Sequence, residues 1–584
     1  MTPYPDPTRR QLLAAAAVSA IPATSMAGQA PASQTSTGGA SQPATGPETR
    51  PDTPFAAVDI DAAGRLIGRT YAETERSMMQ AGLVRSRDVM TRLRAREIAP
   101  GVEHAVIFDP VLPGRSLPTG ASRFEPPRQS LPEYDGNPAS LAFATVADLS
   151  ALIHAGKVTS LELARMYLDR LKRHGPALHC VITLTEELAL KQAERADAEL
   201  KAGRSRGPLH GIPYGAKDLL ATKGIPTTYG VEPLKDQVLD FDATVIRRLE
   251  EAGAVLLCKT SLGELAMGDV WFGGTTRNPW DPEKGSSGSS AGSCSGTAAG
   301  LFAFAIGSET LGSIVSPCVV CGTTGLRPTF GRVPRTGALP LTRTMDKLGP
   351  ITRSVDDLAF VLSAIHGPDD HDPTCHDTPF TWSGPEVEGI RIGYDRTAFE
   401  AIERMNNAGV KTLYTEALAR CRELFGELVP VELPRDRLAT PTAMATIEVE
   451  GAESFSELID AGGMQQLVQQ EPGSWPNTFR RAGLFPAVDY LRFQRVRRQL
   501  MEQVDAAMEG VDVFVTIPRV GPNLVLTNLT GHPTCILRCG MIEGMPHQIE
   551  FTGRLYGEGP LLAVASRFEQ TVAARDQWPK ERWA

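Results

Sequence analysis

From residue 138 onward, the apolar positions alternate between helical spacing and short continuous runs. Tyr167, Leu168 and Leu171 repeat on one helical face, and Thr159 with Glu162 forms a capping box before them. Gly175 and Pro176 then indicate where this helix ends. A second helix is expected at about 185–201, because its charges alternate along one side.

The apolar runs predict buried strands between the helices. The strand candidates are 254–258, 302–306, 390–392 and 511–517, with a helix of small residues ending at 297–301. Strands that alternate with helices favour an α/β layer architecture. We therefore expect a large mixed, twisted β-sheet whose two faces are covered by helices.

The same pattern divides the chain into segments. Charged residues at helical spacing over 56–104, followed by Pro- and Gly-rich sequence to 137, predict a helical N-terminal extension and a wrapping loop over 55–137. The catalytic domain is expected over 138–584. Within it, 396–505 is mostly helical with polar faces, and we interpret it as an insertion or cap beside the sheet.

The first residues carry the features of an export signal. Arg9 and Arg10 precede a weakly apolar, Ala-rich stretch, and 25–27 reads Ser-Met-Ala, a small-x-small cleavage site. We interpret 1–27 as a twin-arginine signal peptide and expect a periplasmic or secreted protein. The alternative is an uncleaved tail that happens to contain two arginines. Residues 28–54 are rich in Ser, Thr, Pro and Gly, which predicts a flexible linker.

Composition narrows the class of protein without identifying it. The 584 residues are 42% hydrophobic with a net charge of −9, as in ordinary soluble enzymes. This mild acidity gives no reason to expect a nucleic-acid partner. No apolar stretch is long enough for stable membrane insertion after signal removal. The nine scattered cysteines do not resemble a disulfide framework.

The segment 285–317 holds the residues most suited to catalysis. It reads GSSGSSAGSCSGTAAGLFAFAIGSETLGSIVSP, and its apolar run argues against a simple linker. Small residues around serines let the backbone approach a substrate and present N–H groups to an oxyanion. A serine needs a base, and a lysine serves only when burial lowers its pKa towards 7–8. Lys217 follows a tight turn among small and apolar residues.

These stretches together resemble the amidase signature family. GPLHGIPYGAKD, NPWDPEKGSSGSSAGS, GSETLGSIVSP and GLRPTFGRVPRTG occur in the family's order and spacing, and the resemblance covers about 138–575. It implies that Lys217 is the base, that Ser289 is a bridging serine after a cis peptide bond, and that Ser313 is the nucleophile. Backbone N–H groups of Thr310, Leu311, Gly312 and Ser313 would hold the oxyanion.

The implied activity is hydrolysis of a carboxylic amide to a carboxylate and ammonia or an amine. A proton would pass from Ser313 through Ser289 to Lys217 and return to the leaving nitrogen, and water would then hydrolyse the acyl-enzyme. No metal or organic cofactor is needed. The expected partner is a small-molecule amide, and a homodimer is compatible with the resemblance.

The chain departs from the family pattern beside the nucleophile. The common form is Asp-x-Gly-Gly-Ser-Ile-Arg, whereas this chain has Glu309, Leu311 and Val315 at the first, third and last positions. Leu311 still has an N–H group, but its side chain could narrow the pocket. Val315 removes a cation that could have paired with the acidic residue.

Several other interpretations remain open at this stage. Ser290 lies in a G-x-S-x-G motif, which in α/β-hydrolases should follow a strand directly. The histidines and acids of 366–377 could bind a metal, and Cys318 and Cys321 form a C-x-x-C that could be redox-active, although small buried hydrophobes are preferred. Within the family, the alternatives are an amidotransferase-type subunit that supplies ammonia to mischarged tRNA and a catalytically inactive binding protein.

Overall fold

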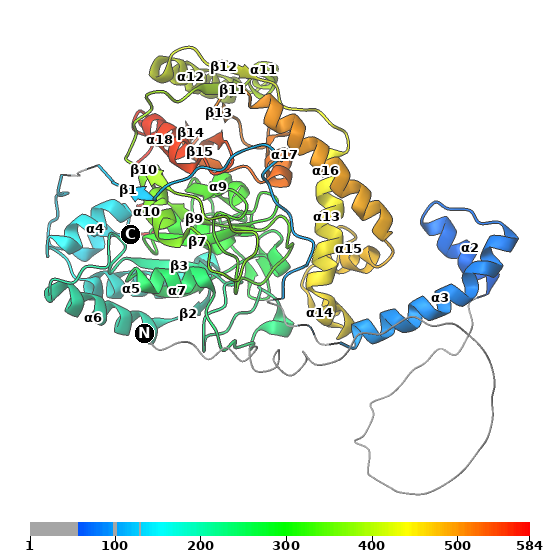
Figure 1. The fold of residues 1–584 in the computed structure, drawn as a ribbon. Helices are drawn as coiled ribbons and strands as arrows, with labels where there is room; N and C mark the ends of the chain where they lie inside the picture. The colour runs from blue at the N-terminus through cyan, green and yellow to red at the C-terminus, as the bar shows by residue number, and fades with distance from the viewer. Residues whose placement is uncertain (1–55, 97, 99–101, 128–129) are drawn as a thin grey trace, which may run out of the picture. The chain divides into compact units, whose positions relative to one another are not determined.

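A central sheet of 11 strands organises the computed structural model (Figure 1). The structure describes residues 56–584 except 97, 99–101 and 128–129. The predicted signal peptide and linker therefore lie outside the described residues. From one edge to the other the strands are β12 (Val429–Val431), β11 (Ile392–Asp395), β13 (Val513–Thr516), β15 (Met545–Gly553), β14 (Thr534–Ile542), β8 (Thr324–Arg327), β9 (Lys347–Thr352), β7 (Phe304–Glu309), β3 (Pro213–Lys217), β4 (Val255–Thr260) and β2 (Val181–Leu184).

The sheet is mixed and is covered on both faces. β3 runs parallel to β4 and β7, whereas β9 runs antiparallel to β7. Every residue of β3, β4, β7 and β9 is buried. Because successive side chains of a strand point to opposite faces, complete burial requires packing on both sides. The predicted α/β fold is confirmed.

The covering helices follow the sequence pattern closely. The helices are α4 (Val146–His154), α5 (Ser160–Leu178), α6 (Glu186–Lys201), α7 (Thr244–Glu251), α8 (Ala291–Ala298), α9 (Val315–Cys321), α10 (Val355–Ile365), α17 (Asn523–Thr530) and α18 (Glu558–Glu569). Thr159 caps α5 as predicted, with its hydroxyl accepting the Glu162 N–H. The helix does not end at Gly175, however. It includes Pro176 and stops when His179 adopts a left-handed conformation at φ 48°, because a proline in a last turn removes little hydrogen bonding.

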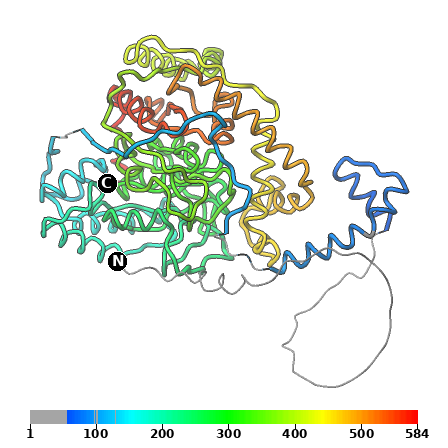
Figure 2. The backbone as a smooth tube through the Cα atoms, viewed as in Figure 1, coloured from blue at the N-terminus to red at the C-terminus, as the bar shows by residue number. Residues whose placement is uncertain are grey.

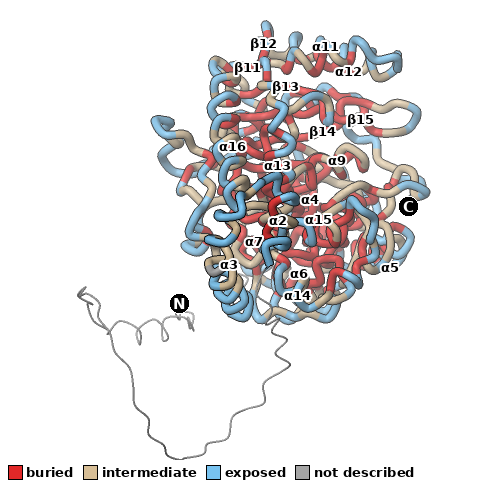
Figure 3. The backbone as a smooth tube through the Cα atoms, turned by 90° about the vertical axis from the view of Figure 1, so that its right-hand side faces the viewer, coloured by how far each residue is buried: buried red, intermediate tan, exposed pale blue. Residues whose placement is uncertain are grey.

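The segment 396–505 contains α11 (Arg396–Glu403), α12 (Ala408–Phe425), α13 (Ala439–Ser454), α14 (Ser456–Asp460), α15 (Trp475–Ala482) and α16 (Ala487–Ala507). It is therefore mostly helical, but it also supplies β12, which pairs with β11 at the edge of the central sheet. Figure 3 shows how buried positions concentrate in the strands, while exposed positions follow the outer helices. The boundaries 396 and 505 of a separate cap stay a prediction.

The N-terminal extension has two parts. α2 (Ala57–Leu66) and α3 (Glu73–Arg94) are linked by Arg76, which donates to Asp61 at 2.8 Å and to the Tyr71 carbonyl at 3.0 Å. Residues 102–127 then run as a nearly strandless segment over the catalytic core (Figure 2). Its short strand β1 (Arg123–Phe124) pairs in parallel with β10 (Thr381–Trp382).

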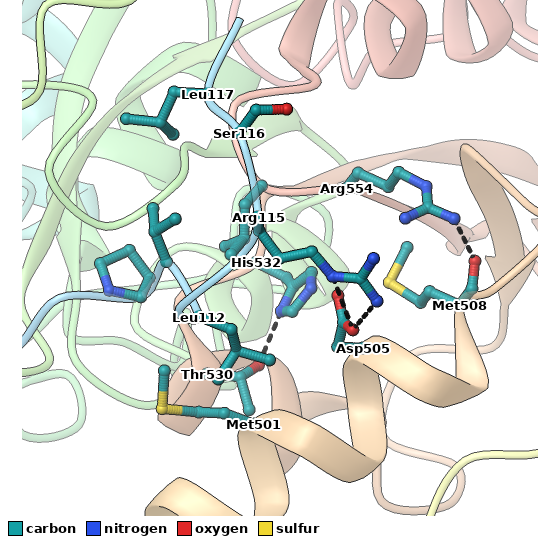
Figure 4. A pocket seen from close by; sticks show the side chains of 13 residues that line it. Leu112, Arg115, Ser116, Leu117, Met501, Asp505, Met508, Thr530, His532 and Arg554 are labelled. Carbon is teal, nitrogen blue, oxygen red and sulfur yellow. Dashed lines mark hydrogen bonds and ion pairs between the residues drawn. The ribbon is translucent and has the colours of Figure 1, made fainter.

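This segment encloses a cavity of about 130 Å³ against α16 and the end of α17 (Figure 4). Arg115 Nε donates to Asp505 of α16 at 3.1 Å and so ties the segment down. The buried His532 side chain lines the cavity and is hydrogen-bonded to the Thr530 hydroxyl at 2.7 Å. Among the described helices, none is both long and apolar enough to cross a membrane.

Candidate active site

The predicted base lies where two parallel strands end. Lys217 is the last residue of β3, and β7 beside it ends at Ser308 and Glu309. Parallel neighbours bring their carboxyl ends to one edge of the sheet. Gly215 makes this neighbourhood tight, because a Cβ there would lie 2.8 Å from Thr260 and 3.0 Å from Phe302.

Lys217 is completely buried among hydroxyl groups. Its Nζ lies 2.8 Å from Ser289 Oγ, 2.8 Å from Ser308 Oγ and 3.1 Å from Ser290 Oγ. Burial lowers the pKa of this amine from 10.5 to about 7, and the more distant acids Asp346 and Glu309 only partly oppose the change. A substantial neutral fraction is therefore present near neutral pH, as a general base requires.

The neutral amine has a defined set of hydrogen bonds. The Ser290 hydroxyl donates its single proton to the Ser308 carbonyl at 3.0 Å, so towards Lys217 it acts as an acceptor. The amine can therefore donate to Ser290 and to Ser308, which leaves its lone pair for the Ser289 hydroxyl. This arrangement suits proton transfer between Ser289 and Lys217.

The loop that carries Ser289 is tightly constrained. The Gly288–Ser289 peptide bond is cis, as the family resemblance implies. A side chain at position 288 would clash, because a Cβ would lie 1.8 Å from the Gly268 carbonyl oxygen. The Ser287 N–H donates to Asp269 at 2.8 Å, and Ser290 then begins α8. A buried loop of this kind holds the Ser289 hydroxyl in one place.

Ser313 lies beside this loop. The Ser290 N–H donates to the Ser313 carbonyl at 3.0 Å, which brings the two serine segments together. Ser313 is 9% exposed, whereas Ser289 is fully buried, so the predicted nucleophile is the one closer to solvent. Among the described residues, no hydrogen bond joins the Ser289 and Ser313 hydroxyls, and the proton step between them remains a proposal.

Glu309 shapes the loop that leads to Ser313. Its Oε2 accepts the N–H groups of Ile314 and Val315 at 2.8 and 2.9 Å. Its Oε1 accepts from Arg327 at 2.7 Å and from Asn528 at 2.8 Å. A single carboxylate therefore holds both the start of α9 and two neighbouring elements, β8 and α17.

The cation that Val315 cannot supply comes from elsewhere in the fold. Arg327 of β8 forms a fully buried ion pair with Glu309. Burial alone would raise the pKa of Glu309, but the charges of Arg327 and Lys347 lower it to about 2. The carboxylate is therefore ionised at all ordinary pH values, and the departure at Val315 leaves no unpaired charge.

The loop 310–313 presents backbone donors. Within the described part of the chain, the N–H groups of Leu311, Gly312 and Ser313 have no hydrogen-bond acceptor, and Gly312 adopts a φ of 88°. Convergent N–H groups without a partner can stabilise an oxyanion. Thr310 instead directs its hydroxyl to Asp346 at 2.5 Å. Its part in an oxyanion hole would be limited to its backbone.

Three contributors to this site were missed by sequence reasoning. Ser308 contacts the base directly, and its place next to Glu309 in the same motif was an available signal. Arg327 lies in the GLRPT stretch that carried the resemblance, but its partner could not be read from it. Asn528 had no sequence signal, because it reaches Glu309 across 219 residues of chain.

The competing interpretations fit the structure less well. Ser290 follows a loop rather than a strand and directs its hydroxyl to Ser308, unlike a nucleophile elbow. In the described ranges, no group of three or more His, Cys, Asp or Glu residues could hold a metal ion. Cys318 and Cys321 are buried free thiols, and burial raises their pKa well above 9. They are packed as small hydrophobic side chains.

A family model described as Amidase matches residues 162–522. The chain belongs to the amidase family. Among curated amidase-family proteins, a glutamyl-tRNA(Gln) amidotransferase subunit of Moorella thermoacetica is 33% identical over 488 residues, which are 75% of this chain and 99% of that protein. The corresponding protein of Chloroflexus aurantiacus is 34% identical over 481 residues, covering 75% and 98%.

Solved amidase-family structures share the fold. Native peptide amidase from Stenotrophomonas maltophilia superposes with a TM-score of 0.67 at 32% identity, over 74% of this chain and 98% of that one. A bacterial aryl acylamidase of the amidase signature enzymes gives a TM-score of 0.66 at 21% identity, which supports the fold alone. The chain is thus an amidase-signature enzyme with amide-hydrolysing relatives.

Proposed function

We propose that this protein hydrolyses a carboxylic amide through an acyl-enzyme on Ser313. The observation that carries the proposal is the buried amine of Lys217, which has a pKa of about 7 and lies 2.8 Å from Ser289. A buried lysine surrounded by hydroxyls has no evident structural purpose, because an apolar side chain would fill the space without the burial penalty.

The reaction begins with proton transfer along the three side chains. Lys217 takes the proton of Ser289 while Ser289 takes that of Ser313, and the Ser313 oxygen attacks the carbonyl carbon. The backbone N–H groups of Leu311, Gly312 and Ser313, with that of Thr310, stabilise the oxyanion. The proton returns through Ser289 to the leaving nitrogen, so ammonia or an amine departs. Water then attacks the acyl-enzyme by the same relay and releases the carboxylate.

A panel of amides tests the proposal. The full-length protein is incubated with fatty, aryl, small aliphatic and C-terminal peptide amides, and released ammonia or amine is measured. We expect turnover of at least one class, and Ser313→Ala should abolish it for all. Full activity of Ser313→Ala would overturn the assignment, as would failure of the wild-type protein to react with a serine-directed fluorophosphonate.

The curated relatives favour a second candidate, an amidotransferase-type subunit. They are 31–34% identical to this chain and are matched over 96–99% of their own length. Such a subunit would use the same residues on glutamine and pass ammonia to a partner. Glutaminase activity that requires the addition of partner proteins would support this candidate. Turnover of other amides by the isolated chain would support the simple amidase.

We also propose that the enzyme is exported by the twin-arginine route. Arg9, Arg10 and the Ala-rich stretch after them support it. Replacing both arginines by lysine should retain the protein in the cytoplasm of a bacterial host, whereas the wild-type protein should reach the periplasm. Equal distribution of the two proteins on cell fractionation would remove this proposal without affecting the amidase chemistry.

A further inference from the structure

Arg519 lies next to the nucleophile segment in an unusual backbone conformation. It follows β13 in the sequence Pro518-Arg519-Val520 and has a φ of 63°. A non-glycine residue in the left-handed region is strained, and such strain gathers at functional sites. Its Nη2 donates to the Ser316 carbonyl at 3.0 Å. The strained turn therefore directs the guanidinium towards α9.

Ser316 connects this arginine to the loop that presents Ser313. The Ser316 N–H donates to the Gly312 carbonyl at 2.7 Å. A Cβ at Gly312 would lie 3.0 Å from Ser316 Oγ and 3.3 Å from Leu524. Ser316 thus packs directly on the oxyanion loop, and Arg519 lies on the other side of Ser316. One residue separates the cation from the backbone that would bind the reacting carbonyl.

No acid of the protein neutralises this cation. Among residues 56–584 as described, no carboxylate forms an ion pair with Arg519, and burial is the sole cause that lowers its pKa. The nearby Asp395 is already engaged, because its oxygens accept the Ala398 N–H and the Thr516 hydroxyl. By contrast, Arg327 and Arg335 each bind a carboxylate within 3.0 Å.

The cation is open to a ligand on one side and has apolar neighbours on the other. Arg519 is exposed, while Leu311 and Leu524 are partly buried beside the oxyanion loop and Val520 follows in the turn. A guanidinium beside apolar groups attracts a carboxylate more strongly than one in open water, because less solvent screens the charges. A single unpaired donor fork at an apolar rim is suited to binding one anionic group of a ligand.

We propose that Arg519 binds a carboxylate of the substrate, so that the preferred amides are anionic. This inference rests on the proposed amidase function and names its substrate class. The carboxylate belongs either to the acyl half, as in the monoamide of a dicarboxylic acid, or to the amine half, as in an N-acyl amino acid. In both cases Arg519 is a specificity-determining residue and takes no part in proton transfer.

Matched pairs of substrates test the proposal on the full-length enzyme. The acyl-side pair is the monoamide of a dicarboxylic acid and the primary amide of the same length ending in methyl. The amine-side pair is an N-acyl amino acid and the corresponding N-acyl alkylamine. The pair with the larger anionic preference in kcat/KM identifies the half that carries the carboxylate. Because charges are screened by salt, this preference should fall as ionic strength rises.

Variants of Arg519 then assign the preference to this side chain. Arg519→Gln should lower kcat/KM for the anionic substrate by about tenfold to a hundredfold, the usual strength of a charge-assisted hydrogen bond, and leave the neutral substrate unchanged. Arg519→Lys should keep part of the preference. The control is Arg165→Gln on the exposed face of α5, which should change neither rate.

The outcomes separate this inference from the proposed function. Equal use of charged and neutral amides by the wild-type enzyme, or an anionic preference that survives Arg519→Gln, would overturn the inference and leave the amidase assignment intact. An enzyme that turns over neither substrate and resists the fluorophosphonate would instead refute the function. Unchanged thermal midpoints of the variants establish that folding is not the cause of any loss.

Discussion

Replacing Lys217 by methionine removes a buried amine from the centre of the site while keeping a side chain of similar length. In the native protein this amine is neutral above a pKa of about 7, whereas a lysine in the unfolded chain is protonated up to about pH 10.5. The unfolded state therefore binds more protons between these values. By linkage, the stability contributed at this position rises with pH across the window.

The size of the effect follows from the two pKa values. A tenfold change in a proton equilibrium is worth about 1.4 kcal/mol. Between pH 7 and pH 9 the penalty for burying the amine should fall by about 2 kcal/mol. The wild-type protein should therefore gain about 2 kcal/mol in free energy of unfolding relative to Lys217→Met over this interval, because methionine does not titrate.

Urea denaturation of both proteins at pH 7, 8 and 9 measures this difference, and amide turnover is followed in parallel. Lys217→Met should lose at least two to four orders of magnitude in rate, the usual contribution of general base catalysis or more. Wild-type kcat/KM should fall below about pH 7 as the amine is protonated. Lys235→Met, on an exposed lysine paired with Glu232, is the control and should show neither effect. A stability difference that is flat from pH 7 to pH 9 would refute the neutral buried amine.

Three further changes probe the rest of the site. Ser290→Ala should still be labelled by a fluorophosphonate, whereas Ser313→Ala should not, and the reverse result on mass spectrometry would favour the elbow serine. Glu309→Gln should destabilise the protein by about 3 kcal/mol in urea denaturation, because it leaves the buried Arg327 charge without its partner; retention of full stability would show that the pair is dispensable. Gly312→Ala should lower kcat more than KM, since a side chain at φ 88° is strained beside Ser316; unchanged kinetics would separate this loop from the oxyanion.

Much of the secondary structure could be predicted because it depends on local pattern. The capping box at Thr159, the helix now seen at Glu186–Lys201 and the buried strand at Val255–Thr260 all follow from neighbouring residues. The errors are also local in origin. Pro176 was expected to end a helix that continues to Leu178, and the strand expected from residue 302 begins at Phe304.

The pairing of charges could not be predicted in the same way. The sequence indicated that Glu309 lacks the usual cation at position 315, but its actual partners Arg327 and Asn528 come from two other elements. Side-chain reach across a sheet depends on strand order, and strand order is a property of the assembled fold. The same reason explains why Arg519 attracted no attention until its turn was placed beside Ser316.

The amino-acid sequence by itself determined the chemical types and their order: a lysine at the end of one strand, a serine-rich loop before a helix, and a second serine after another strand. It did so because each motif is contained in a few adjacent residues. Only the tertiary structure decided that Lys217 meets Ser289 across 72 residues of chain and that its amine is completely buried. A pKa depends on everything packed around a group, so its value is set by segments that are distant in sequence and adjacent only in the folded protein.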